Sequence, residues 1–245
     1  MSNIPITEQI YPSKKQIDHL GNVEAFNIIL KDQLSFYQAI KKNKNIILKL
    51  VNFLTKHLSD YKNSRLVYCG AGTSGRIGVQ DGVELPPTFG WSYERIDFII
   101  AGGEKALLKS IENSEDDIEQ ARFLFKKKKI TQFDIVICIA ASGNTIFTNE
   151  ILELCKQKKV KTIAISNNPK GKILKKADYK IILDTKQEVI AGSTRLKAGT
   201  AQKICLNIIS SMVMIKMGRV KNGLMNEMVP TNKKLRLRKK LNQNS

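Results

Sequence analysis

The stretch RLVYCGAGTSGR, residues 65–76, decides the fold. In it a short apolar run ends in a loop of small residues, and a helical pattern follows. The same order recurs along the chain, with strands expected at Arg65–Cys69, Arg95–Ile100, Asp134–Ala140, Lys161–Ser166 and Tyr179–Leu183, and helices near 75–84, 115–128, 146–159, 172–176 and 193–217. Strands that alternate with helices predict right-handed βαβ units, and so an α/β fold with a doubly wound, mainly parallel sheet flanked by helices.

The rest of the chain is organised around this sheet. Between Phe26 and Leu54 apolar residues recur at three- and four-residue steps, which predicts an N-terminal helical segment over residues 1–62. Residues 63–225 are expected to form the sheet domain, and residues 226–245 a basic C-terminal tail. A chain of 245 residues is long enough for one large domain with appendages.

Composition excludes several classes of protein. The longest apolar run, Ile204 to Ile215, is shorter than the ~17–25 residues of a bilayer span, and the N-terminus lacks a signal-peptide pattern. We therefore expect a soluble, cytoplasmic protein with no membrane partner. The net charge of +19 is carried by lysines spread along the chain, which predicts a solvated surface that attracts anions rather than a nucleic-acid site. Four scattered cysteines and two histidines offer little material for a metal centre.

Two of the loops that follow strands combine glycines with hydroxyl side chains. The first holds Gly72, Thr73 and Ser74, and the loop after the third strand holds Ser142, Asn144 and Thr145. Ligands of open parallel sheets bind beyond the carboxyl ends of the strands. Backbone N–H groups and hydroxyls at a helix start can hold an anion there, so these loops predict a phosphate cradle. The alternative is that Ser74 and Ser142 only cap helices.

The first loop also contains the spacing GxGxxG, at Gly70, Gly72 and Gly75. A dinucleotide site additionally requires an acidic residue at the end of the second strand, about 20 residues further on. That strand instead runs into Ile99, Ile100 and Ala101. The pattern therefore argues against a nicotinamide cofactor.

Five segments carry a family resemblance: GAGTSGRIGVQDGVELPPTFG (70–90), AGGEKALLKSIENSEDD (101–117), AASGNT (140–145), GSTRLKAGTAQK (192–203) and TNKKLRLR (231–238). Together with Thr7-Glu8 they resemble the N-acetylmuramic acid 6-phosphate etherases, which have the SIS (sugar isomerase) fold. The resemblance implies cleavage of the D-lactyl ether of N-acetylmuramate 6-phosphate to N-acetylglucosamine 6-phosphate and D-lactate, in cell-wall amino-sugar recycling. It further implies a phosphosugar substrate, a homodimer, and neither a metal nor an organic cofactor.

The family's acid/base glutamates fall on Glu84 and Glu115. We expect Glu84 at the end of the helix that begins in the first loop, just before Pro86 and Pro87 stop that helix. There the negative end of the helix dipole favours a protonated carboxyl group, which suits proton transfer. Which glutamate removes the sugar's C2 proton is open from sequence, with Glu84 preferred.

Glu115 is expected in a first helical turn that opens with a capping box of Ser114 and Asp117. Acidic residues in such a turn commonly serve only the helix dipole, which is the alternative role for Glu115. In the GSTRLKAGTAQK block, Ser193 and Thr194 are expected to donate hydroxyls, and Arg195 and Lys197 to meet an anion or shape the dimer. Lys203 is expected at the surface or an interface.

Two departures from the family pattern affect the expected site. Asn144 stands where the family usually has arginine, and the sequence stops soon after TNKKL, which predicts a more open active site. The main alternative function is a non-catalytic sugar-phosphate-binding regulator that resembles the glucokinase regulatory protein. A phosphosugar isomerase or aldolase-like enzyme is a further alternative, whereas a nucleic-acid regulator is disfavoured because no helix-turn-helix pattern is present.

Overall fold

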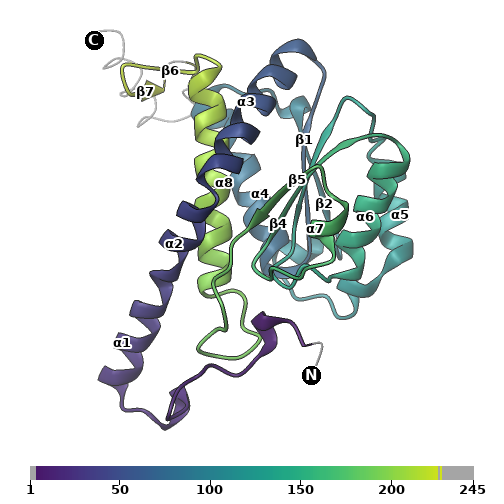
Figure 1. The fold of residues 1–245 in the computed structure, drawn as a ribbon. Coiled ribbons are helices and arrows are strands. Elements are labelled where there is room, and N and C mark those ends of the chain that lie inside the picture. The colour runs from purple at the N-terminus through teal and green to yellow at the C-terminus, as the bar shows by residue number, and fades with distance from the viewer. Residues whose placement is uncertain (1–3, 226, 228–245) are drawn as a thin grey trace.

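A computed structural model of the chain describes residues 4–225 and 227. Its centre is a parallel sheet in the order β2-β1-β3-β4-β5 (Figure 1). The strands are β1 (Leu66–Gly70), β2 (Ile96–Ile100), β3 (Ile135–Ile139), β4 (Lys161–Ser166) and β5 (Tyr179–Ile182). All five predicted strands are confirmed to within one residue at each end.

Helices cover both faces of the sheet, which confirms the doubly wound architecture (Figure 1). The helices of the sheet domain are α4 (Gly72–Phe89), α5 (Ile118–Lys127), α6 (Ile146–Gln157), α7 (Ile173–Lys176) and α8 (Lys197–Lys216). Alternate strand residues face opposite layers, because successive side chains of a strand point to opposite faces. Tyr68 and Ile137 pack with α4 and α8, whereas Val67 and Val136 pack with α5 and α6.

Helix α8 is the one helix in the described part of the chain that is long and apolar enough to cross a membrane by composition. More than half of its apolar window is buried inside the protein. It shares a core with the sheet and with α3 (Lys44–Asp60), through residues such as Leu206, Ile209 and Val213. These contacts identify α8 as a core helix.

The N-terminal helical segment is confirmed from Asn22 onward, as α1 (Asn22–Gln33), α2 (Ser35–Lys42) and α3. Before Asn22 the described residues form only two short 3₁₀ turns, η1 (Ile6–Glu8) and η2 (Ile17–His19). Pro5 and Pro12 lie in this stretch and lack the N–H that a continuous helix needs. Helix α3 is buried against the sheet, whereas α1 extends away from the body of the molecule (Figure 1).

Asn43, between α2 and α3, ties the N-terminal helices to the far edge of the sheet. Its side-chain amide donates to the carbonyl of Ile182 at 2.7 Å and accepts from the N–H of Ile182 at 3.1 Å. It also donates to the carbonyl of Ala39 at 2.8 Å. Asn43 therefore pairs with the exposed edge of β5 much as a further strand would, and such pairing protects a sheet edge.

The described chain ends in a hairpin of β6 (Val220–Lys221) and β7 (Leu224–Met225). Three further 3₁₀ turns, η3 (Tyr93–Arg95), η4 (Glu104–Leu107) and η5 (Ser114–Asp116), flank β2 and precede α5. The predicted basic tail, including the TNKKLRLR segment, lies outside the described residues apart from Glu227.

Candidate active site

The two predicted loops lie side by side, because β1 and β3 are neighbours in the sheet. The chain leaves β1 toward β2 on one side, while β3, β4 and β5 follow on the other. The sheet therefore has its topological switch point between β1 and β3, where ligands of doubly wound proteins bind. The loops at residues 70–75 and 140–145 both open at this point, as expected from the sequence.

The first loop brings the start of α4 close to the sheet. A side chain at Gly70 would place its Cβ 2.9 Å from the nitrogen of Gly75, so the close approach requires glycine. Gly72 has a left-handed φ of 51°. The N-cap of α4 is Ala71, and no side chain caps this helix. The capping alternative for Ser74 is therefore wrong, and its mostly buried hydroxyl makes no hydrogen bond to any described residue.

The second loop is held by its own polar groups. The Ser142 hydroxyl oxygen accepts the N–H of Asn144 at 3.2 Å, and the Asn144 side-chain oxygen accepts the N–H of Lys172 at 3.1 Å. Helix α6 begins after Thr145 and has no side-chain cap, so Ser142 does not cap it. Asn144 thus has a structural contact, whereas the hydroxyls of Ser142 and Thr145 donate no hydrogen bond to the residues that the structure describes.

Sequence reasoning missed a supporting layer at the end of β4. The Ser166 hydroxyl donates to the carbonyl of Ala141 at 3.3 Å, and the Asn168 side-chain amide donates to the carbonyl of Ser142 at 2.9 Å. Asn167 is fully buried, and its side-chain oxygen accepts a hydrogen bond from the side-chain amide of Gln202, on α8, at 2.8 Å. Three consecutive polar residues, the last of β4 and the two after it, were the available signal for this layer.

The GSTRLKAGTAQK block lies beside the first loop. A Cβ at Gly199 would contact the methyl group of Thr73 and the side chain of Ile77 at 3.3 Å each. Ser193, in the loop before α8, is half-buried and turns back through its N–H to the carbonyl of Ile190. The structure therefore brings this block to the edge of the first loop.

Lys197 is directed elsewhere. Its side chain is only 3% exposed, and its ammonium contacts the Asp32 carboxylate of α1 at 2.7 Å. The first N–H groups of α8, from Lys197 and Ala198, donate to the buried carboxylate of Glu188. Burial raises the pKa of Glu188, although these two N–H bonds oppose that effect. Lys197 and Glu188 thus anchor the start of α8, and the Lys197 ammonium is engaged by Asp32.

Glu84 lies in the interior of α4 rather than at its end. The helix continues through Pro86 and Pro87 to Phe89 and ends at Gly90, which has a left-handed φ of 61°. The expectation that the prolines stop the helix is wrong, because proline removes one hydrogen bond but keeps a helical φ. The exposed Glu84 stands eleven residues, about three turns, after Thr73, so the two residues share one side of α4.

Glu115 lies in η5 and is exposed, but the predicted capping box is wrong. Asp117 is itself the N-cap of α5 and accepts the N–H of Gln120 at 2.8 Å, while the Ser114 hydroxyl donates to the carbonyl of Ile111. The segment that carries Glu115 is tied to α4, because Arg76 donates to the carbonyl of Ala106 at 2.9 Å. Turn η5 also packs beside α6, which begins in the second loop.

A buried polar network joins α4 to α8. The Asp81 carboxylate accepts hydrogen bonds from Tyr68, Asn207 and Ser210, at 2.8, 2.8 and 3.0 Å. Burial raises the pKa of Asp81, and the three hydrogen bonds together with the nearby charge of Lys203 oppose that rise. The network fixes the two helices against each other on one face of the sheet.

Two family models match the chain. One is the glucokinase regulatory protein N-terminal SIS domain, over residues 46–156, and the other is the SIS domain, over residues 104–212. Among curated proteins, the N-acetylmuramic acid 6-phosphate etherase of Clostridium acetobutylicum is 41% identical over 94% of this chain and 75% of its own length. The N-acetylmuramic acid 6-phosphate etherase of Francisella philomiragia is 42% identical over 94% of this chain and 77% of its own length.

Solved structures share the fold at low sequence identity. A phosphoheptose isomerase from Francisella tularensis has a TM-score of 0.58 at 15% identity, covering 80% of this chain and 100% of its own. An Escherichia coli CFT073 protein in complex with A5P has a TM-score of 0.59 at 15% identity, covering 83% of this chain and 97% of its own. These similarities establish the SIS-type fold.

Proposed function

The chain belongs to the N-acetylmuramic acid 6-phosphate etherase family, and from that premise we propose how it acts. It cleaves the D-lactyl ether of N-acetylmuramate 6-phosphate and yields N-acetylglucosamine 6-phosphate and D-lactate, in the recycling of cell-wall amino sugars in the cytoplasm. One observation carries the proposal. The hydroxyl-bearing loops meet at the switch point of the sheet, and α4, which starts in the first loop, presents Glu84 on the same side as Thr73.

The chemistry follows from the substrate. An ether is hard to hydrolyse directly, because an alkoxide leaves poorly. In the open-chain sugar, however, the C2 proton lies next to an aldehyde and the lactyl oxygen lies one carbon further on, at C3. A base removes the C2 proton, the C3–O bond breaks, and an acid protonates the departing oxygen, which releases D-lactate. Water then adds to the resulting double bond, with its hydroxyl at C3 and a proton at C2.

The residues divide these tasks. Gly72, Thr73, Ser74, Ser142 and Thr145 hold the phosphate through N–H groups and hydroxyls at the starts of α4 and α6. Glu84 removes the C2 proton, and Glu115 protonates the lactyl oxygen. Ser193 adds a hydroxyl from the edge of the cradle. Asn144 and Lys197 contribute by holding the second loop and the start of α8, through Lys172 and Asp32 respectively.

Release of D-lactate from N-acetylmuramate 6-phosphate is the direct test. The purified protein is incubated with this sugar and, in parallel, with unphosphorylated N-acetylmuramate, and D-lactate is assayed in both. We expect lactate only from the phosphorylated sugar. A protein that binds the phosphosugar tightly without releasing lactate would instead be the alternative, a regulator of the glucokinase regulatory protein type.

Isotope labelling separates elimination from simple hydrolysis. In heavy water the product sugar should gain deuterium at C2, and in ¹⁸O-labelled water the label should enter the sugar at C3 and be absent from the lactate. This follows because the bond to C3 is cut and water re-adds there. Mass spectrometry of both products reads the outcome, and label in the lactate alone would contradict the mechanism.

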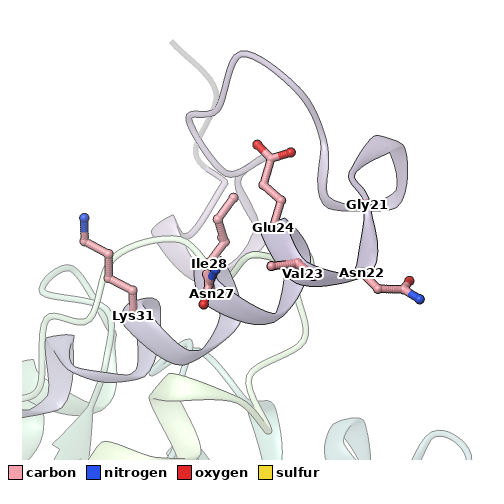
Figure 2. A pocket seen from close by; sticks show the side chains of 7 residues that line it. All are labelled: Gly21, Asn22, Val23, Glu24, Asn27, Ile28 and Lys31. Atoms are coloured by element: carbon pink, nitrogen blue, oxygen red, sulfur yellow. The ribbon is translucent and has the colours of Figure 1, made fainter.

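We further propose that the protein is a homodimer assembled through α1. This helix extends from the body, and large apolar side chains are exposed on it and at its C-cap, with Phe26 63% and Leu34 62% exposed. Residues of α1 and the preceding Gly21 also line an open hollow of about 650 Å³, as Figure 2 shows: Gly21, Asn22, Val23, Glu24, Asn27, Ile28 and Lys31. Exposed apolar surface of this kind marks an interaction site, and a second copy of the chain is the partner that the family resemblance favours.

Sedimentation equilibrium tests the dimer. The wild-type protein should sediment at twice the mass of the chain, and the double variant Phe26→Asp/Leu34→Asp at the monomer mass, since a charge on an apolar interface is costly to bury. The matched control is Phe123→Asp, a change at an equally exposed phenylalanine on α5. A monomeric wild type would refute this assembly.

A further inference from the structure

Helices α4 and α8 run parallel and side by side, with a continuous seam between them (Figure 1). At one end of the seam Gly199 of α8 packs against Thr73 of α4. Further along, Asn207 and Ser210 of α8 bond to Asp81 of α4. The seam therefore begins at the phosphate cradle and leads toward Glu84, one turn beyond Asp81.

Lys203 lies on this seam. It follows Gly199 by four residues and precedes Asn207 by four, so all three share one side of α8. Its neighbours on that side face α4, yet Lys203 itself is exposed. Because Gly199 contacts Thr73 and Asn207 bonds to Asp81, Lys203 is positioned between these two contacts. Lys203 thus presents a positive charge at the surface, between Thr73 and Glu84.

The other cationic side chains of α4 and α8 are either paired with protein groups or far from Lys203. The Arg76 guanidinium donates to the carbonyls of Ala106 and Lys109, and Lys197 is buried against Asp32. Lys216 is thirteen residues beyond Lys203, about 20 Å along α8. On α4 and α8, Lys203 is the cation that the structure leaves exposed beside the path from the cradle to Glu84.

The substrate has two anionic groups that need separate partners. The phosphate is at C6, and the carboxylate of the lactyl group is attached through the ether oxygen at C3. With the phosphate in the cradle, the C3 side of the sugar extends along the seam toward Lys203, which lies four residues, about 6 Å, beyond Gly199 on α8. Resting on the proposed function, we propose that Lys203 binds the lactyl carboxylate and so orients the C3–O bond.

Binding measurements test this role without relying on turnover. In the Glu84→Gln background, which leaves the substrate intact, the affinities for N-acetylmuramate 6-phosphate and N-acetylglucosamine 6-phosphate are measured by calorimetry, with and without Lys203→Met. The second sugar lacks the lactyl carboxylate. We expect the affinity for the first to fall by about 10- to 150-fold and the affinity for the second to change by less than twofold.

Matched variants exclude general effects. Lys175→Met removes an exposed lysine on α7 and should alter neither affinity, and Lys203→Arg should restore binding of the lactyl sugar. In the otherwise wild-type enzyme, Lys203→Met should raise KM for lactate release. Urea unfolding identifies any variant that fails to fold, and Lys203→Gln then provides the same comparison.

Each alternative outcome overturns the assignment. Equal losses for both sugars would mean that Lys203 meets the phosphate or supports the Asp81 network, and no loss for either would remove it from the site. The proposed function fails separately, if the wild-type protein releases no D-lactate. The difference in affinity between the two sugars would still report on Lys203 in that case.

Discussion

At the amino ends of the strands the Arg65 guanidinium is fully engaged, whereas at the carboxyl ends the hydroxyls of Thr73, Ser74 and Thr145 bond to nothing in the described structure. Arg65 donates to Asp134 at 2.8 Å and to Asp97 at 3.1 Å. It also donates to the carbonyls of Lys128 and Lys129. The two ends of one sheet thus differ in whether their polar groups already have partners.

This difference separates stability from function. Groups that are paired within the protein hold β1, β2 and β3 together, and breaking such a pair leaves a buried charge without compensation. Groups that are left without protein partners at a switch point are free to bind a ligand. Changes at the amino end should therefore alter stability, and changes at the carboxyl end should alter binding and catalysis.

The largest expected effect is at the carboxyl end. Glu84→Gln should lower kcat for lactate release by about 10²–10⁴-fold, the usual contribution of a general acid or base. Because Glu84 is exposed, its urea unfolding midpoint should not move. Glu94→Gln, an exposed glutamate in η3 before β2, is the control and should keep full activity. A Glu84→Gln enzyme with more than a tenth of the wild-type kcat would exclude Glu84 from the mechanism.

The amino end should show the opposite behaviour. Arg65→Met leaves the Asp134 carboxylate, 3% exposed, without its cation, so the free energy of unfolding should fall by about 2–4 kcal/mol. The kcat of the folded enzyme should stay within twofold of wild type. Arg122→Met, which breaks exposed ion pairs, should leave the urea midpoint nearly unchanged. If Arg65→Met lowered kcat without lowering the free energy of unfolding, the proposed division between a stabilising amino end and a functional carboxyl end would be wrong.

A smaller effect is expected for Ser74→Ala. Removing this hydroxyl should weaken binding of N-acetylglucosamine 6-phosphate by about 1.5–3 kcal/mol, the value of a hydrogen bond to a charged group. Stability should change little, because no described protein group loses a partner. Calorimetry with the phosphorylated and unphosphorylated sugars measures this, and equal affinities for the two sugars in the wild type would argue against a phosphate cradle.

The smallest expected effect is the pH dependence of the stability that the Arg65–Asp134 pair contributes. Burial raises the pKa of Asp134, but its hydrogen bonds from Arg65 and Thr131 prevail, so the pKa is lowered overall. A lowered pKa in the folded state stabilises the protein above the unfolded value of about 3.9, and this contribution is lost as pH falls. The stability gap between wild type and Arg65→Met, from urea unfolding at pH 7, 5 and 3, should therefore narrow toward pH 3. If the difference in stability between wild type and Arg65→Met instead grew as the pH fell, the pKa of Asp134 would not be lowered in the folded protein.

The strands were predictable because buried parallel strands are continuous apolar runs, such as Ile135–Ile139. The end of α4 could not be predicted in this way. Proline usually stops a helix, but here the burial of Leu85 and Pro86 and the cap at Gly90 extend the helix through Pro86 and Pro87. Tertiary packing decided the outcome, as it often does against local propensity.

The candidate site was predictable only in part. The loops carry their own signal in glycines and hydroxyls, so their meeting at the switch point could be expected. The burial of Lys197 could not, because its partner Asp32 lies 165 residues away in the sequence. The choice between Ser114 and Asp117 as the cap of α5 was equally hidden, since both residue types cap helices well.

The hydrogen bond between Asn43 and Ile182 joins residues 139 positions apart, so it can form only some time after Asn43 has been synthesised. At about 5–20 residues per second, the ribosome needs roughly 7–30 s to make β5 after it has made Asn43. During that interval the apolar face of α3 has neither β5 nor α8 to cover it. The apolar face of α3 therefore stays exposed on the nascent chain until β5 and α8 have been made, and chaperones that bind apolar segments can bind it during that time.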